Sequence, residues 1–118
     1  MSLRLNSEVR LQGLQPQTLL AIQVIYALWV KSYSEEDMTI TSVVDGDHSG
    51  GPLETSSHYS GSAIDIDLEP LQPVFQKQFS DDCAARLTRD FHLHYYVADE
   101  NEKAHLHIAY IPRRPASL

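Results

Sequence analysis

The sequence predicts an α+β domain with a small, largely antiparallel sheet and flanking helices. Its predicted elements follow the order helix, strand, long loop, strand, helix, strand and strand, which is typical of this fold class. The composition agrees, because 42% hydrophobic and 21% charged residues are ordinary values for a globular protein. A length of 118 residues corresponds to one domain, over residues 1–118. The single cysteine, Cys83, excludes a disulfide framework, and we expect it to be buried as a small hydrophobic residue.

Three segments in the first half of the chain have recognisable patterns. Residues 15–31 predict the main helix, because Pro16 suits its first turn and apolar residues surround it almost completely. Such a helix is expected to be buried at the centre of the fold. Residues 3–11 alternate weakly and indicate an arm or a short strand. Residues 38–44 are rich in β-branched residues and predict a strand.

A long loop is predicted over residues 45–61, which hold four of the five glycines. Loops of this length in small domains are usually functional or disordered. Residues 63–68 alternate between apolar and polar side chains, and predict the strand into which the loop leads.

The second half predicts one helix and two closing strands. Residues 71–90 have a helical pattern, with Pro73 near the start and Ser80 as a capping residue before an acidic first turn. Residues 93–97 and 105–111 predict strands joined by a polar turn.

The charge balance excludes several classes of partner. Nine basic residues stand against sixteen acidic ones, which gives a net charge of −7. An acidic chain without a basic stripe repels phosphate backbones, so no nucleic-acid partner is expected. No apolar run is long enough to predict a membrane span, and no signal-peptide pattern opens the chain. We therefore expect a cytoplasmic protein unless something else releases it from the cell. No oligomeric state is predicted.

Histidines are concentrated in the loop and in the two closing strands, and they suit a zinc site. A catalytic zinc ion needs three protein ligands, usually imidazole and carboxylate groups, and an open fourth position. His58 ends the loop, and Asp65 follows on the next strand. His105 and His107 are two residues apart on a strand and so share one face. One of this pair can ligate a metal while the other supports a ligand or contacts the substrate.

The remaining histidines have weaker signals. His92 and His94 repeat the same spacing, but no carboxylate stands at a comparable distance, so we expect them to be strand residues near the surface. His48 is interpreted equally well as a substrate contact at the rim of the pocket or as an ordinary polar loop residue. Asp67 shares a face with Asp65, and we expect either a solvent-facing acid or a support for a ligating histidine.

Three motifs together resemble those of a known family. They are Ser42, Asp45, Gly46 and His48; then Ser56, Ser57, His58, Tyr59, Gly61, Ala63 and Asp65; then Glu102, His105 and His107. This compound pattern resembles the LAS group of zinc peptidases, which includes D-alanyl-D-alanine carboxypeptidases and dipeptidases, lysostaphin-type endopeptidases and the hedgehog signalling fold. The similarity covers roughly residues 39–110 and is greatest to the small single-domain branch found in phages and bacteria. The resemblance also implies that the protein could be released to the cell wall as a phage lysis protein.

The resemblance implies a hedgehog- or DD-peptidase-like fold and a zinc ion bound by His58, Asp65 and His107. It further implies that His105 stabilises charge on the reacting carbonyl and that a nearby glutamate is the general base. Glu102 takes that place in this sequence. His48, Ser57 and Tyr59 are the residues then expected to bind substrate.

The position of Glu102 departs from the family pattern. In the dipeptidase branch the glutamate lies three residues before the last ligand, where this chain has Ala104. Glu102 lies five residues before His107 and would face away from it in an unbroken strand. We therefore expect Glu102 to lie in the turn or beside a bulge, with Glu100 as the alternative base.

The function that follows is zinc-dependent hydrolysis of a peptide bond in bacterial peptidoglycan peptides, of carboxypeptidase or endopeptidase type. Two alternatives stay open. One is a cytoplasmic D,D-dipeptidase with the same site, and the other is a metal-binding module of the same fold that has lost catalysis. The expected substrate, a stem peptide or a D-Ala-D-Ala-type peptide, follows from the resemblance alone.

Overall fold

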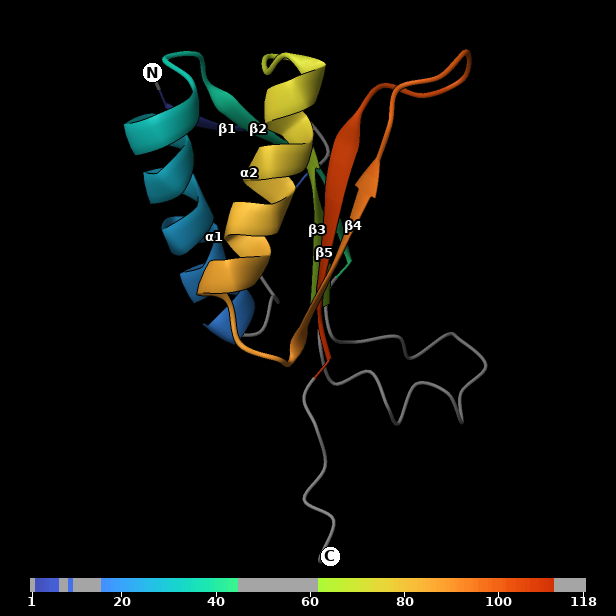
Figure 1. Ribbon diagram of the computed structural model, residues 1–118. Coiled ribbons are helices and arrows are strands. Elements are labelled where there is room, and N and C mark those ends of the chain that lie inside the picture. Colours follow the sequence, from blue (N-terminus) through green and yellow to red (C-terminus); the bar gives the residue numbers. More distant parts are fainter. Residues whose placement is uncertain (1, 7–8, 10–15, 45–61, 112–118) are drawn as a thin grey trace, which may run out of the picture.

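The protein is a five-stranded mixed sheet with two helices packed on one face, seen in a computed structural model that describes residues 2–6, 9, 16–44 and 62–111 (Figure 1). The strands lie in the order β1-β2-β3-β5-β4. Their bounds are Leu3–Leu5 for β1, Met38–Val44 for β2, Ser62–Asp67 for β3, Phe91–Tyr96 for β4 and His105–Tyr110 for β5. All neighbouring pairs are antiparallel except β1 and β2. The predicted α+β class with a largely antiparallel sheet is confirmed.

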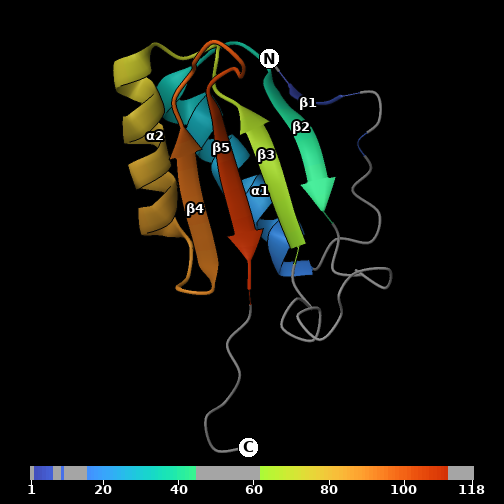
Figure 2. The same cartoon turned by 90° about the vertical axis from the view of Figure 1, so that its right-hand side faces the viewer.

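Both helices cover the same face of the sheet and leave the other face open. Helix α1 spans Pro16–Leu28 and continues as a single π-helical turn, Trp29–Tyr33, and helix α2 spans Pro73–Arg86. Figure 2 shows the strands in front and both helices behind them. None of the described helices is long and apolar enough to cross a bilayer.

The core lies between the sheet and the helices. Trp29 and Phe79 meet edge to face with ring centroids 5.4 Å apart, and both side chains are fully buried. Cys83 is 1% exposed, as predicted, and burial raises the pKa of its thiol to about 12. Strand residues with buried apolar side chains complete this core: Met38, Ile40, Ile64, Ile66, Leu106 and Ile108.

Apolar and polar residues alternate along β3 and β5, so the polar side chains point to the open face. Ile64 and Ile66 are buried on the helix side, and successive strand residues point to opposite faces. Asp65 and Asp67 therefore point away from the helices, as do His105 and His107 on β5. The local pattern of the sequence thus assembles a polar surface on the side of the sheet that faces away from the helices.

A β-bulge in β2 lies directly opposite Asp65. Ile40 pairs with Ile66, but the next pair is Ser42 with Asp65, so Thr41 is an extra residue on β2. The hydroxyl of Thr41 donates to the backbone carbonyl of Asp65 at 3.4 Å. Bulges are common beside active sites, where they redirect a side chain.

Two expectations about the helices were wrong. Helix α2 begins at Pro73 with Gln72 as its N-cap, so Ser80 lies inside the helix, buried, and caps nothing. Proline at the first turn has a preset φ and needs no N–H partner, and this outweighs the Ser-Asp-Asp pattern. Helix α1 is not buried on all sides: Leu20 is 59% exposed and Val24 is 40% exposed.

Candidate metal and catalytic site

The centre of the candidate site is a hydrogen-bonded pair of side chains on the open face. Asp65 and His107 are directly opposite each other in the β3–β5 ladder. The Nδ1 atom of His107 lies 2.7 Å from Oδ1 of Asp65, and the two side chains are 37% and 26% exposed. Because an ionised carboxylate only accepts hydrogen bonds, Nδ1 of His107 donates. An ion ligated by both side chains would lie between Nδ1 and the carboxylate, in place of the shared proton.

His105 lies two residue pairs further along the same ladder, opposite Asp67. Its Nδ1 atom lies 3.0 Å from the carbonyl oxygen of Lys103, which only accepts, so Nδ1 carries the proton. The ring stacks on Tyr96, its cross-strand partner, with centroids 4.5 Å apart and planes 10° apart. Nε2 of His105 can therefore donate to an oxyanion only when the ring carries a second proton. The sequence predicted that His105 stabilises charge. The structure adds that the proton of its neutral ring is on Nδ1.

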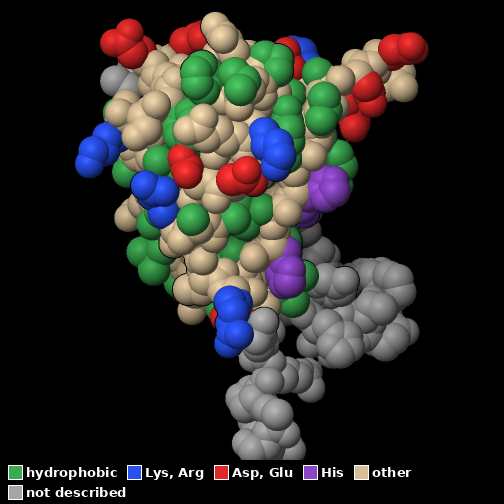
Figure 3. All heavy atoms as spheres, viewed as in Figure 1, with side chains coloured by type: hydrophobic (Ala, Val, Ile, Leu, Met, Phe, Trp, Pro, Cys, Tyr) green, Lys and Arg blue, Asp and Glu red, His purple; other side chains and the backbone are tan. Residues whose placement is uncertain are grey.

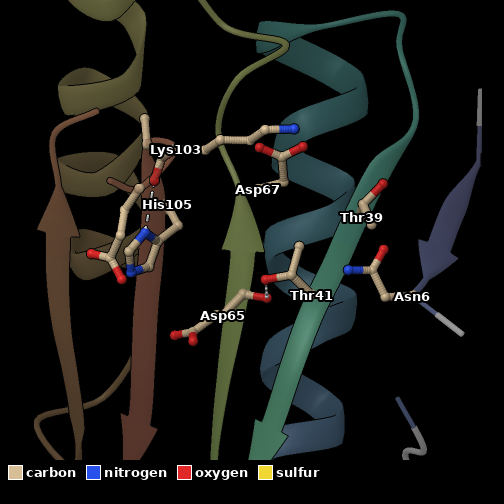
Figure 4. Close-up of a pocket in the computed structure, with 9 residues that line it drawn as sticks. Asn6, Thr39, Thr41, Asp65, Asp67, Lys103 and His105 are labelled. Atoms are coloured by element: carbon tan, nitrogen blue, oxygen red, sulfur yellow. Dashed lines mark hydrogen bonds between the residues drawn. The ribbon is translucent and has the colours of Figure 1, made fainter. Parts of the chain in front are cut away.

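Asp65 and His105 line a cavity of about 500 Å³ on the open face of the sheet, and His107 is outside its lining. Figure 4 shows the labelled members from the open side of the sheet: Asn6, Thr39, Thr41, Asp65, Asp67, Lys103 and His105. Glu102 and Ala104 complete the lining. Three carboxylates therefore share the cavity with one ammonium group, which favours a cationic ligand such as a divalent metal ion.

Glu102 lies in the turn between β4 and β5, not in a strand. The turn is closed by Asp99, whose Oδ1 accepts the backbone N–H groups of Asn101 at 2.7 Å and Glu102 at 2.8 Å. The backbone N–H of Asp99 donates to the carbonyl of Glu102 at 2.9 Å. These hydrogen bonds hold the pKa of Asp99 below its usual value. Because Glu102 is outside the strand, the odd spacing to His107 does not turn it away, and it lines the cavity with His105.

The alternative base, Glu100, is exposed in the same turn and is not among the residues that line this cavity. Asp67 faces His105 across the ladder, but its Oδ1 accepts the backbone N–H of Glu69 at 2.9 Å. In Figure 4 the side chain of Lys103 extends toward Asp67. Among the contacts that the structure describes, Asp67 supports no ligating histidine.

Four predicted site residues lie outside the described residues: His48, Ser57, His58 and Tyr59. The structure therefore brings together Asp65 and His107 of the predicted ligands, with Glu102 and His105 beside the same cavity. Within residues 2–6, 9, 16–44 and 62–111, no group of three or more His, Cys, Asp and Glu side chains is arranged to hold a metal ion. The described pair still fits zinc chemically, because it joins a carboxylate and an imidazole in contact on an accessible surface.

The second pair of histidines is on β4, at the edge of the sheet. His92 and His94 are both exposed, as predicted, and Figure 3 shows histidine side chains on the strand side of the molecule. His94 is nevertheless the cross-strand partner of His107. Sequence reasoning missed this proximity, and it also missed the stacking of Tyr96 on His105. The two His-x-His motifs on consecutive predicted strands were a usable signal, because a hairpin can place one histidine of each motif opposite the other, as it does for His94 and His107.

In comparisons with models of known protein families, with curated proteins and with solved structures, nothing matches the chain.

Proposed function

We propose that this protein is a zinc-dependent peptidase with a hedgehog- or DD-peptidase-like fold, acting on a peptide bond of bacterial cell-wall peptides as a carboxypeptidase or endopeptidase. The observation that carries the proposal is the Asp65–His107 pair, hydrogen bonded at 2.7 Å between neighbouring strands. Two residues 42 positions apart in the sequence, both expected as ligands, meet on the open face. The cavity beside them holds the expected base and the expected charge-stabilising histidine.

The residues that would hold the metal ion are His58, Asp65 and His107. When bound, zinc supplies Lewis acidity and lowers the pKa of a coordinated water molecule. Asp65 would add the negative charge that balances part of the ion. Both side chains of the pair are partly exposed, so a substrate carbonyl could approach an ion bound there.

The protein groups supply the remaining chemistry. Glu102 accepts a proton from the attacking water and passes it to the amine of the departing peptide. His105, protonated on both ring nitrogens, donates from Nε2 to the oxygen of the tetrahedral intermediate. Its other nitrogen stays bonded to the carbonyl of Lys103, and Tyr96 restricts the ring from one side. The ring thus needs little reorganisation when charge develops.

The test measures metal content and hydrolysis together. Purified protein with one equivalent of zinc is expected to release amines from isolated peptidoglycan and from its stem peptides. Asp65→Ala and His107→Ala should lose both the metal and the activity, whereas His92→Ala, an exposed histidine of β4, should keep both. Wild-type protein that binds zinc but cleaves no wall preparation would support the inactive module instead. Cleavage confined to free D,D-dipeptides would support the dipeptidase.

A further inference from the structure

One wall of the cavity on the open face carries uncharged polar groups that the proposed chemistry does not use. They are Asn6, which directly follows β1, and Thr39 and Thr41 of β2. The charged side chains of the lining come from β3 and from the turn that precedes β5 (Figure 4). The cavity therefore has a charged end, where the reaction is proposed, and a neutral end.

The backbone of Asn6 is fixed on both sides. Its N–H group donates to the carbonyl of Ile40 at 3.1 Å, and its own carbonyl accepts the N–H of Val9 at 2.9 Å. In Figure 4 its carboxamide points across β2 toward Thr41. Among the residues that the structure describes, neither this carboxamide nor the hydroxyl of Thr39 has a hydrogen-bond partner. Both groups are therefore available to a ligand in the cavity.

The strand register places Asn6 in one row with the proposed metal ligands. The parallel pairing of β1 with β2 brings Asn6 beside Thr41, and the bulge puts Thr41 beside Asp65, which faces His107. Neighbouring strands are about 4.8 Å apart, so Asn6 and Asp65 are about 10 Å apart across the sheet. An extended chain advances about 3.3 Å per residue, so about three residues span this distance.

We infer that the Asn6 carboxamide binds a main-chain peptide group of the substrate, about three residues from the scissile bond. A carboxamide suits this role, because it offers donors for a carbonyl oxygen and an acceptor for an N–H group. The hydroxyl of Thr39 can donate or accept beside it. This inference rests on the proposed function.

The neutral end of the cavity also indicates the length of the substrate. A free carboxylate or ammonium terminus would find no opposite charge in the lining there. Arg4, which is nearby on β1, is outside the lining and is ion-paired with Asp37 at 3.4 Å. The substrate chain is therefore expected to continue across this end. A peptide of about four or more residues fits, whereas a free D,D-dipeptide is too short to reach Asn6.

A series of wall peptides tests this inference with the zinc-loaded full chain. N-acetylated stem peptides of two to five residues share the same two C-terminal residues. For the wild type, kcat/KM should rise about tenfold once the peptide reaches Asn6, which corresponds to two ordinary hydrogen bonds. Asn6→Ala should lose this gain through a higher KM and should leave the dipeptide unaffected. Gln17→Ala, which removes an exposed carboxamide on α1, is the matched control and should change neither.

A binding measurement separates this inference from the proposed function. Stem-peptide analogues with the scissile amide reduced to a methylene-amine cannot be hydrolysed. The five-residue analogue should shift the side-chain NH₂ signals of Asn6 in NMR spectra, and the two-residue analogue should not. These shifts without hydrolysis of any peptide would support the role of Asn6 and overturn the proposed function. Hydrolysis that is independent of peptide length, or unchanged in Asn6→Ala, would overturn the role of Asn6 alone. Neither hydrolysis nor shifts would overturn both.

Discussion

Replacing Glu102 by glutamine tests how the turn between β4 and β5 contributes to catalysis. Asp99 fixes the backbone of Glu102 through hydrogen bonds of 2.7–2.9 Å within this turn, and the cavity lining includes Glu102 but not Glu100. Glutamine keeps the size and polarity of the side chain but cannot accept the proton. General-base catalysis contributes about 10²–10⁴-fold in rate. Glu102→Gln should therefore slow hydrolysis of wall peptides at least about a hundredfold.

The loss should fall on kcat, because the proton moves in the transition state and not during substrate binding. Steady-state kinetics on a purified stem peptide, with zinc content measured on the same sample, separates these effects. Glu100→Gln is the matched control, in the same turn and equally exposed, and should change kcat less than twofold. A large loss of kcat in Glu100→Gln, with kcat unchanged in Glu102→Gln, would refute the assignment of Glu102 as the base. If neither glutamine variant changes kcat while His105→Ala lowers it strongly, the turn has no part in the mechanism.

Two further predictions concern titration. The pKa of Asp99 is lowered by its backbone hydrogen bonds, so the turn should be fully formed above the ordinary value of about 3.9 and loosen as the pH falls through the lowered pKa. The amide NMR shift of Glu102 should record this loosening, and Asp99→Asn should remove that step from the pH profile. Burial and a hydrogen bond to Asp82 raise the pKa of Tyr33 to about 12, so its contribution to stability should be complete below about pH 10 and vanish as the pH rises through 12. Tyr33→Phe should lower the free energy of unfolding at pH 7 by about 1 kcal/mol. In urea titrations it should reduce the alkaline loss to the part that comes from the buried Cys83 thiol, whose pKa is also raised to about 12. A loss as large as that of the wild type would show that Tyr33 does not contribute to it.

Much of the fold could be predicted from the sequence, because it depends on local patterns of residues. Residues 38–44 were predicted as a strand and form β2 with these bounds, and β5 ends one residue earlier than predicted. Alternating apolar residues in β3 and β5 identified both the core face and the polar face. Helix α1 was different, because an uncharged apolar helix does not indicate which of its sides contacts the sheet.

The candidate site was predictable where it depends on residue types, and unpredictable where it depends on register. The Asp65–His107 contact requires β3 and β5 to pair in one specific alignment, and no short pattern encodes that alignment. The bulge at Thr41 and the position of His94 beside His107 depend on pairing in the same way. The proton on Nδ1 of His105 depends on the carbonyl of Lys103, which only a folded backbone places there.

A crystal structure of the zinc-loaded protein, measured at the zinc absorption edge, tests the proposed metal site most directly. We predict one anomalous peak on the open face of the sheet, with Asp65 and His107 as ligands and His58 as the third. We also predict that Glu102 and His105 face the remaining coordination position. A peak beside His92 and His94, or no peak at saturating zinc, would contradict this prediction.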